Sequence, residues 1–547
     1  MIADISVSEK SFGPKLLMSG IKFSIDDSEK VGVIGRNGVG KSTLFGILAG
    51  TDKDFTGDII YKRGTVVVAT AQEHHDTGDV TVLQYVLAGL PEYSQLSRII
   101  ESYPLKMGDN MKLINEYTQA LMRFDDKGFY QIEEQIEREL DNFQLPAVAH
   151  RAFSTLSGGQ KRLVEVVKVM HSDAHLALVD EPTNHMDYIA KSQYIEWMKT
   201  AREAMLVITH DRDVLNEVDR IIELKDGDSV SYKGNYDAYL KQNAVSTGTQ
   251  MNDFEMVEKR IVNLKSKVID YQRLKEKSRN PGTIQKFKRL EETSRKELGE
   301  LQAKEKPTFW IDKESAAGLN YKVAAQYDKF KAKNIRMSLK DDESRSKHVL
   351  VSARGVSLGY GDKPLFEGVN IDLREGEALE FRGRNGAGKT TLIKYLLQSS
   401  SDITSFAGEF SLDPHVRIGV YEQEVSPTYF DLPLEAAIER MYLDRNLSVS
   451  VTKIRNLLSD YLFNEGDGKT PVSRLSGGQK ARFQLISMLA NNPQLLILDE
   501  PTNHLDLPSI EELETALGKY AGAVIYVSHD GYFRQALGGD VLQIGAK

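Results

Sequence analysis

The chain has 547 residues, of which 41% are hydrophobic and 27% charged, with a formal net charge of −9. These shares are those of a soluble globular protein, so a disordered or fibrous chain is excluded, and the length allows about three or four domains. The sequence contains no cysteine and no run of about 20 apolar residues, which excludes disulfide frameworks, thiolate metal clusters, cysteine nucleophiles and a membrane domain.

The first chemical motif lies between a predicted strand at 30–35 (KVGVIG) and a predicted helix at 44–50 (LFGILAG). The intervening GRNGVGKST is the pattern of a phosphate-binding loop, whose backbone N–H groups and helix N-terminus face the β-phosphate. Lys41 would reach the β and γ oxygens, and Ser42 would ligate Mg²⁺. The alternative, a glycine-rich turn beside a structural lysine, does not account for the complete pattern. The candidate nucleotide-binding residues are Gly35, Asn37, Gly38, Gly40, Lys41, Ser42 and Thr43.

LSGGQ at 156–160 begins a predicted helix, QKRLVEVVKVM. A serine, two glycines and a helix N-terminus together form a second anion site. Alone, the motif is also compatible with an ordinary serine-capped helix. The candidate residues are Ser157, Gly158, Gly159 and Gln160.

The apolar run LALVDE predicts a buried strand that ends in Asp180 and Glu181. The first acid can orient Mg²⁺ through water, and the second can accept a proton from the water that attacks the γ-phosphate. A helix N-cap after a strand is the alternative for the aspartate. His210 follows the predicted strand MLVIT, where it suits a γ-phosphate sensor, although a lone histidine at a strand end is more often structural.

Residues 240–345 are rich in Lys, Glu, Gln and Leu, which predicts two long helices. SRNPGT at 278–283 places Pro281 and Gly282 where a helix must stop, so the helices form a hairpin. A helix of about 30 residues would reach about 45 Å. The linker between the flanking regions is therefore expected to be a long projection.

The linker is also basic, because residues 251–340 carry 22 Lys and Arg against 13 Asp and Glu. The densest part lies at the predicted tip, where Tyr271 and Phe287 are interleaved with the cations. Such a tip is suited to RNA, since basic groups release counterions and rings stack on bases. A solvated charged coiled coil is the alternative. The candidate RNA-binding residues are Arg273, Lys275, Lys277, Arg279, Lys286, Lys288 and Arg289.

The motifs then recur in the same order, as GRNGAGKTT at 383–391, LSGGQK at 475–480, DEPTNHLD at 499–506 and SHD at 528–530. The offset from Ser157 to Ser476 is 319 residues, as it is for the glutamates and histidines, and this repetition favours functional roles for both histidines. The first copy has about 29 more residues before its LSGGQ. The second set is Gly383, Asn385, Gly386, Gly388, Lys389, Thr390, Thr391, Ser476, Gly477, Gly478, Gln479, Asp499, Glu500 and His529, with Thr390 and Asp499 as Mg²⁺ ligands.

These motifs resemble the ATP-binding cassette family over about 1–240 and 348–547. The resemblance implies that two cassettes dock head to tail, so that residues 476–478 close the Lys41 site and residues 157–159 close the Lys389 site. It implies further that Phe12 and Tyr360 stack on adenine, and that Gln72 and Gln423 sense Mg²⁺ and the attacking water.

Two cassettes with a charged helical linker and an insertion in the first cassette resemble the ABC-F family of cytosolic ATPases that act on the ribosome. The implied fold is α/β, with a first cassette at 1–244 carrying an arm at about 90–140, a basic two-helix linker at 245–345 and a second cassette at 346–547. Met186 departs conservatively from the usual leucine of NHLD. The chain is expected to be a cytoplasmic monomer whose cassettes pair within one chain.

By the same resemblance, two ATP molecules with Mg²⁺ close the cassettes, the closed form binds the ribosomal E site, and hydrolysis releases it. The linker would lie near the P-site tRNA and the peptidyl transferase centre, and the arm would contact the large subunit, so rRNA and tRNA are the expected partners. Routine translation, rescue of stalled ribosomes and protection from antibiotics all stay open. The alternative from another class is a transporter ATPase with separate membrane subunits, which the basic linker disfavours.

Overall fold

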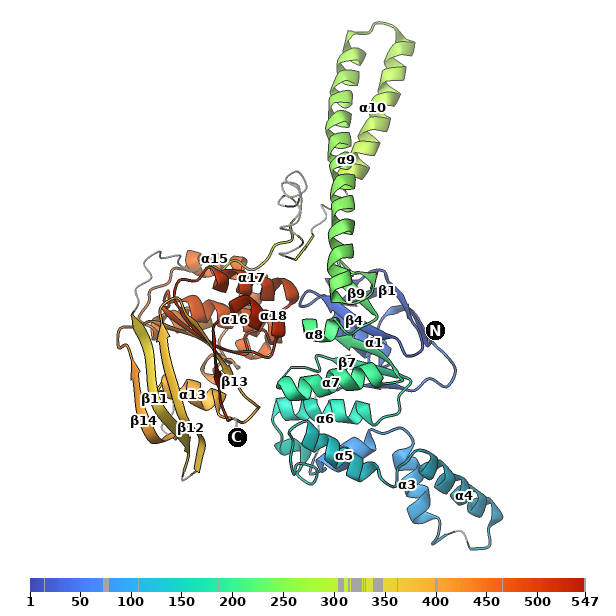
Figure 1. Cartoon of the computed structure of the whole chain (residues 1–547). Helices are drawn as coiled ribbons and strands as arrows, with labels where there is room; N and C mark the ends of the chain where they lie inside the picture. The colour runs from blue at the N-terminus through green and yellow to red at the C-terminus, as the bar shows by residue number, and fades with distance from the viewer. Residues whose placement is uncertain are drawn as a thin grey trace. The chain divides into compact units, whose positions relative to one another are not determined.

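The computed structural model of the chain divides into two compact units, one of Met1–Tyr236 with Ile335–Lys547 and the other of Asp237–Asn334 (Figure 1). The first unit holds both copies of the repeat, and the second holds a helical hairpin. The structure describes residues 1–13, 15–71, 78–106, 108–184, 186–303, 309–312, 315, 327, 329, 331–337, 348–361, 363–398, 402–422, 424–464 and 466–545.

The first cassette is built on two sheets. Its outer sheet is antiparallel and consists, among the described residues, of β1 (Ala3–Phe12), β2 (Lys15–Met18), β3 (Ile21–Ile25) and β5 (Thr56–Tyr61). Its central sheet runs in the order β10 (Asp228–Lys233), β9 (Arg220–Lys225), β4 (Lys30–Gly35), β8 (Ala204–Ile208), β7 (Leu176–Asp180) and β6 (Val67–Ala69).

Strands β4, β7 and β8 of the central sheet are continuous apolar runs, and they are buried almost throughout. They pair in parallel, and strands of parallel sheets are usually buried on both faces. Parallel strands end at the same edge of a sheet, so the loops that follow these three strands meet there. This edge carries the phosphate-binding loop, which leads into α1 (Lys41–Leu48), together with Glu181 and His210.

The helical part of the first cassette has its own apolar core. Ile136, Leu140, Phe143 and Val164 are fully buried in it. Its helices are α2 (Val82–Ala88), α5 (Ile132–Asn142), α6 (Gly158–Met170), α7 (Tyr188–Thr200) and α8 (Arg212–Leu215), with a 3-10 turn at Phe153–Thr155.

The extra residues of the first copy form α3 (Tyr93–Ser102) and α4 (Met111–Asp126), which pack against each other. The rings of Tyr93 and Phe124 lie 5.7 Å apart between these two helices. Helix α5 also lies within the predicted arm and contributes its apolar face to the helical core, to which Leu96 of α3 and Phe124 of α4 also belong. The α3–α4 insertion is therefore packed on this core.

The second cassette repeats this architecture. Its outer sheet consists of β11 (Val349–Tyr360), β12 (Lys363–Arg374) and β14 (Thr404–Leu412) among the described residues. Its central sheet is parallel throughout, in the order β15 (Ile418–Tyr421), β16 (Leu495–Asp499), β17 (Ala523–Val527), β13 (Ala378–Arg382) and β18 (Asp540–Gln543). Its helices are α13 (Lys389–Leu396), α14 (Leu434–Asp444), α15 (Val451–Asp460), α16 (Gly477–Leu489), α17 (Leu507–Gly518) and α18 (Gly531–Leu537), with 3-10 turns at Pro427–Tyr429, Asp467–Lys469 and Val472–Arg474. The predicted fold class is thus confirmed.

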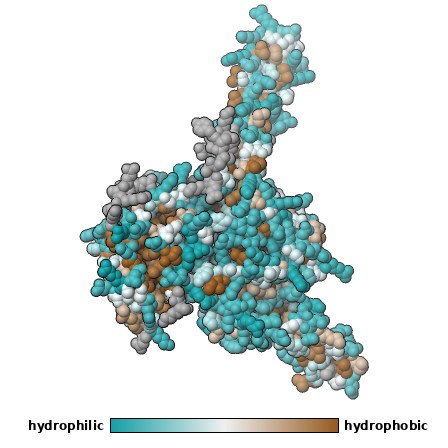
Figure 2. Space-filling view, in the orientation of Figure 1, coloured by the Kyte–Doolittle hydropathy of each residue, from teal (hydrophilic) through white to brown (hydrophobic). Residues whose placement is uncertain are grey.

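The second unit contains a hairpin of α9 (Tyr236–Lys277) and α10 (Pro281–Gln302). The helices break where the sequence predicted, because Asn280 caps α10 by accepting hydrogen bonds from Gly282 N and Thr283 N, and Pro281 occupies the first turn. Helix α9 has 42 residues, more than expected, and so extends about 63 Å. In Figure 2 the surface of this hairpin is mostly hydrophilic.

Candidate functional site

Glycine is required at the end of each phosphate-binding loop. Gly40 and Gly388 cap the helices that follow, with φ angles of 107° and 99°. A side chain at these angles would be strained, and a Cβ on Gly388 would lie 2.8 Å from the ring of Phe366. The backbone N–H groups at the N-termini of α1 and α13 are thereby directed into the two loops, where they suit an anion.

Each loop holds its lysine in the same way. Lys41 Nζ donates to Gly35 O at 2.6 Å, and Lys389 Nζ donates to Gly383 O at 2.8 Å. Both side chains are buried, and burial lowers the pKa of each ammonium. A phosphate group placed in the loop would compensate this cost of burying a positive charge.

A hydroxyl and a carboxylate meet beside each lysine. Ser42 Oγ lies 3.1 Å from Asp180 Oδ2, and Thr390 Oγ1 lies 3.1 Å from Asp499 Oδ2. Mg²⁺ prefers such oxygen ligands and usually takes one or two carboxylates together with substrate phosphates. Ser42 with Asp180, and Thr390 with Asp499, therefore fit that ion chemically in the two cassettes.

The two candidate general bases have an unusual backbone conformation. Glu181 and Glu500 have φ angles of 47° and 51°, in the left-handed region that non-glycine residues rarely adopt. Their N–H groups donate to the neighbouring strands, at Ile208 O and Val527 O. Burial raises the pKa of Glu181 to about 8 and that of Glu500 to about 7. Left-handed backbone conformations at non-glycine residues and shifted carboxyl pKa values are both typical of catalytic positions.

Each histidine faces the glutamate of its own cassette. His529 Nε2 lies 3.1 Å from Glu500 Oε1, and His210 Nε2 lies 3.7 Å from Glu181 Oε1. Burial lowers the pKa of both histidines to about 3, so both are neutral at pH 7. Both ring nitrogens of His210 are buried without a hydrogen-bond partner in the described part of the chain, which is rare in native proteins and suggests a ligand.

The phosphate-binding loop of the first cassette contacts the second cassette. Asn37 Nδ2 donates to His504 O at 2.9 Å, and Asn37 N donates to Asp506 Oδ2 at 3.2 Å. A Cβ on Gly478 would lie 2.2 Å from Asn37 Nδ2, so the LSGGQ motif of the second cassette is pressed against this loop. The structure thus brings together the residues that head-to-tail docking requires at the Lys41 site.

The opposite pairing is present at the other site, where Asn385 N donates to Asp187 Oδ2 at 3.1 Å. Neither Asp187 nor Asp506 was expected from the sequence to have a role. Their signal was available, since both end the repeated DEPTNHxD motif, at the same offset of 319 residues.

A cavity of about 660 Å³ lies between the cassettes at the Lys389 site. Its volume is within the range of ligand sites. Most residues assigned to this site from the sequence line it, from both cassettes. These are Ser157, Gly158, Gly159, Gln160, Tyr360, Asn385, Gly386, Gly388, Lys389, Thr390, Thr391, Asp499, Glu500 and His529.

The two LSGGQ motifs form equivalent helix starts. Ser157 Oγ accepts from Gln160 N, and Ser476 Oγ accepts from Gln479 N, each completing a capping box. A second cavity, of about 40 Å³, is lined by residues of both cassettes, among them Glu181, His210, Glu500 and His529. The two glutamate–histidine pairs therefore lie close to each other across the interface.

The two aromatic residues expected to stack on adenine differ in their surroundings. Tyr360 lines the large cavity and its hydroxyl lies 3.3 Å from Thr391 Oγ1, whereas Phe12 is 67% exposed at the end of β1. Gln72 and Gln423 lie outside the described residues.

The residues before these two glutamines are anchored alike. Ala71 N donates to Glu165 Oε2 at 2.7 Å, and Glu422 N donates to Gln484 Oε1 at 2.9 Å. Both acceptors lie on the helix that follows LSGGQ, α6 or α16, so this helix anchors the backbone of Ala71 and of Glu422.

The seven candidate RNA-binding residues lie at the tip of the α9–α10 hairpin, at the end of α9, in the turn and at the start of α10. All are exposed except Lys275, which is half-buried and pairs with Glu291 at 2.7 Å. The rings of Tyr271 and Phe287 stack on each other, with centroids 6.3 Å apart. These rings therefore join the two helices, and their stacking on RNA bases stays a prediction.

The family model described as "ABC transporter" matches residues 18–184 and 366–503. The chain is 29% identical to the putative ATP-binding protein YdiF of Bacillus subtilis, over all of this chain and 80% of YdiF. It is 28% identical to the ribosome protection protein VmlR of the same species, over 94% of this chain and 81% of VmlR. It is 27% identical to the ABC transporter F family member 5 of Arabidopsis thaliana, over 98% of this chain and 74% of that protein.

Among solved structures, the chain is similar in fold to the archaeal ribosome recycling factor aABCE1, solved with the stalk protein aP1. The TM-score is 0.58 at 16% identity, over 98% of this chain and 87% of the other. Within the described ranges, the structure contains no helix that is long and apolar enough to cross a membrane.

Proposed function

This chain belongs to the ABC transporter family of ATPases, and we propose that it hydrolyses ATP at two interfacial sites and acts on the ribosome in its ATP-bound closed state. Its relatives are ABC-F proteins, as the sequence predicted. The cavity at the Lys389 site carries the first part of the proposal, because the phosphate-binding loop of one cassette and the LSGGQ motif of the other line it together.

In this proposal Lys41 and Lys389 bind phosphate oxygens, and the serine and glycines of the opposite LSGGQ motif bind the same nucleotide. Mg²⁺, when bound, neutralises phosphate charge. Glu181 and Glu500 accept the proton of the attacking water, and the neutral His210 and His529 contact the γ-phosphate. ATP favours the closed form only to the extent that closed cassettes bind it better than open ones, and the LSGGQ contacts supply that difference.

The hydroxyls of Ser42 and Thr390 are expected to set the requirement for Mg²⁺. In a Ser42→Ala, Thr390→Val chain we expect the Mg²⁺ concentration for half-maximal ATPase activity to rise about tenfold, because each site loses an oxygen ligand. Thr200→Val is a suitable control, since its hydroxyl donates to the carbonyls of Glu196 and Trp197 within α7. An unchanged Mg²⁺ requirement in the double variant would show that the hydroxyls are not ligands.

For the ribosome, the proposal is that the closed form occupies the E site, with the α9–α10 hairpin directed toward the P-site tRNA and the peptidyl transferase centre and the α3–α4 arm on the large subunit. The exposed cations of the hairpin tip support an RNA partner. The similarity to a ribosome protection protein along nearly the whole chain supports the same partner. Mg²⁺ and ATP as ligands and rRNA and tRNA as partners are part of this proposal.

The test is the ATPase activity of the purified protein with and without ribosomes. We expect ribosomes to raise the rate several-fold, because their binding surface selects the closed form. ATPase activity without any ribosome binding would instead favour the alternative, an ATPase subunit with a separate membrane partner.

Replacing the cations at the hairpin tip tests whether they are needed for stimulation by ribosomes. In the triple variant Arg279→Glu, Lys286→Glu, Lys288→Glu we expect ribosomes to no longer stimulate the ATPase at moderate salt. The basal ATPase rate should be unchanged, since no residue assigned to an ATP site belongs to the hairpin. The matched control changes the same charge away from the tip, at the exposed Lys265, Lys267 and Lys296. Equal losses in both variants would contradict a specific role of the tip.

A separate part of the proposal concerns the effect in the cell. We propose that the chain protects ribosomes from antibiotics bound near the peptidyl transferase centre, which the similarity to VmlR supports. The measurement is whether expression of the chain raises the inhibitory concentration of such drugs. No change for any drug class would favour a general role in translation.

A further inference from the structure

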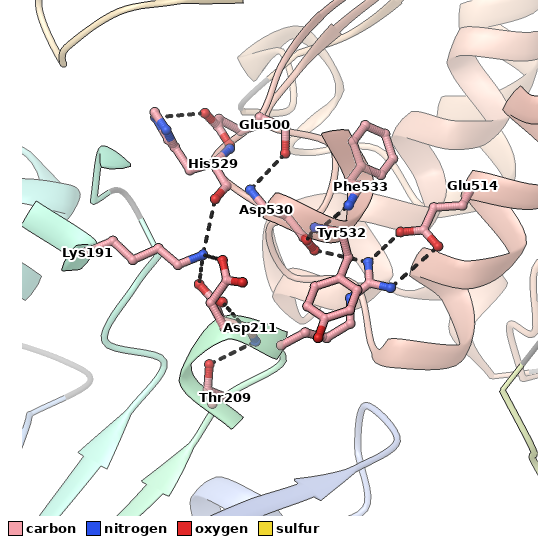
Figure 3. Close-up of polar contacts among 12 residues, drawn as sticks. Lys191, Thr209, Asp211, Glu500, Glu514, His529, Asp530, Tyr532 and Phe533 are labelled. Carbon is pink, nitrogen blue, oxygen red and sulfur yellow. Dashed lines mark hydrogen bonds and ion pairs between the residues drawn. The ribbon is translucent and has the colours of Figure 1, made fainter. Parts of the chain in front are cut away.

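A group of charged residues joins the two cassettes beside their histidines (Figure 3). The cations, Lys191 on α7 and Arg212 on α8, come from the first cassette. Arg212 contacts Glu514 and Asp530 of the second cassette, and its guanidinium lies 4.8 Å from the ring centroid of Tyr532. The Arg212 and Asp530 side chains are 7% and 8% exposed, so this ion pair is shielded from solvent.

The acids in this group follow the two histidines directly. Asp211 follows His210 and caps α8, and Asp530 follows His529 and caps α18. Each aspartate has a cationic partner, but the two partners differ in origin. Lys191 Nζ lies 2.8 Å from Asp211 Oδ2 within the first cassette, whereas Arg212 Nη2 lies 3.2 Å from Asp530 Oδ2 across the interface.

The repeat does not reproduce either cation. At the offset of 319 residues, Lys191 corresponds to Ile510 and Arg212 corresponds to Gly531. A Cβ on Gly531 would lie 3.3 Å from both carboxylate oxygens of Asp213, so the docked interface leaves little room for a longer side chain there. The pairing is thus one-sided, with the cations on the first cassette and the interfacial acids on the second.

The second histidine segment depends on this one-sided pairing. Asp530 Oδ1 accepts from Tyr532 N and Phe533 N, while its other oxygen faces Arg212. The preceding residue is held as well, because His529 N donates to Glu500 Oε2 at 3.3 Å and Lys191 Nζ donates to His529 O at 3.1 Å. Charge-assisted bonds in a buried place fix geometry more strongly than neutral ones.

We propose that Arg212 is a positioning residue for the second ATP site, acting across the interface on Asp530 and through it on His529. Undocking the cassettes separates Arg212 from Asp530 but leaves Lys191 with Asp211. Hydrolysis at the Lys389 site therefore depends on docking through Arg212, and hydrolysis at the Lys41 site does not. The inference rests on the proposed assignment of the two ATP sites, and it is independent of the ribosome.

The test uses single-turnover ATP hydrolysis by the full chain without ribosomes, in two backgrounds. Glu181→Gln leaves only the Lys389 site able to hydrolyse, and Glu500→Gln leaves only the Lys41 site. Adding Arg212→Met is expected to slow hydrolysis about tenfold in the first background and less than twofold in the second, because only the second site loses its positioning contact. The concentration of ATP for half-maximal rate is expected to change little, since the phosphate contacts stay in place.

Two further variants separate positioning from folding. Arg212→Lys keeps a cation within reach of Asp530 and is expected to restore at least half of the lost rate. Lys199→Met removes a cation from the end of α7 that pairs with Glu217 within the first cassette, and it is expected to change neither background. Equal slowing of both sites by Arg212→Met would mean a general docking role, and no slowing would mean no role. Either result would overturn the inference.

If both single glutamine variants failed to hydrolyse ATP, the two-site assignment itself would be wrong, and the inference with it. An inactive chain with normal cassette folding, measured by circular dichroism and ATP binding, would identify that outcome. Loss of ribosome binding alone would leave the inference intact, because no ribosome enters this measurement.

Discussion

Replacing both Glu181 and Glu500 by glutamine is expected to stop ATP turnover and to hold the chain on ribosomes in the presence of ATP. Glutamine keeps the shape of the side chain but cannot accept the proton of the attacking water, and losing a general base typically costs 10²–10⁴-fold, so we expect a loss of about a hundredfold or more. ATP still closes the cassettes, and the step that opens them is blocked. The measurements are ATPase activity and cosedimentation with ribosomes in ATP.

The matched control is Glu134→Gln with Glu439→Gln, which changes one exposed glutamate in each cassette and removes the same charge. We expect this variant to behave as the unchanged chain in both measurements. A catalytic double variant that is inactive yet cosediments no better than the unchanged chain would contradict the proposed switch. It would leave the ATPase assignment untouched.

Local motifs made most of each ATP site predictable. The phosphate-binding loop with its lysine follows β4, and Asp180 ends β7, which is separated from β4 by β8 in the same parallel part of the sheet. Parallel strands end at one sheet edge, so the sequence pattern places Ser42 and Asp180 near each other there. The hairpin break was equally predictable, because Pro281 and Gly282 interrupt a helix locally; the structure adds Asn280 as the cap of α10. These features depend on neighbours close in sequence.

Contacts between the cassettes were less accessible from sequence. Asp187 and Asp506 were visible as repeated letters, but their partners in the opposite loop lie 198 and 469 residues away. Arg212 gave no signal, because the position repeats as Gly531 and its partners belong to the other cassette. Comparing repeats finds what two copies share, whereas this ion pair exists only because the copies differ.

For the hairpin tip, composition predicts the charge but not the contacts of the aromatic rings. A basic segment with two aromatic residues suits RNA, and composition cannot tell whether such rings face a ligand or each other. In the structure Tyr271 and Phe287 stack across the two helices, while the cations around them are mostly exposed. The exposed cations are therefore the basis of the ribosome proposal, and a role of the rings in binding bases stays a prediction.

Gly478→Ala is expected to have the largest effect of any single methyl group at the interface. The new Cβ would lie 2.2 Å from Asn37 Nδ2 and 2.7 Å from Asn37 Cγ. Docking would require Asn37 to rotate and to lose its hydrogen bond to His504 O. We therefore expect the ATPase rate to fall about tenfold or more, because small displacements of catalytic groups slow a reaction strongly. ATP binding to the separate cassettes should be retained. Steady-state ATPase and equilibrium nucleotide binding measure the two effects.

The cause of that loss can be isolated with a second change. Asn37→Ala removes both clashing atoms, so the Gly478→Ala, Asn37→Ala chain should recover part of the rate that Gly478→Ala loses. Gly518→Ala at the end of α17 is the matched control, since no heavy atom of the described residues beyond its own helix and chain neighbours lies within 4 Å of the added Cβ. Recovery would show that close contact between the LSGGQ motif and the opposite phosphate-binding loop limits hydrolysis. A double variant as slow as Gly478→Ala, or a Gly478→Ala chain at full rate, would mean that the two cassettes need not approach this closely for turnover.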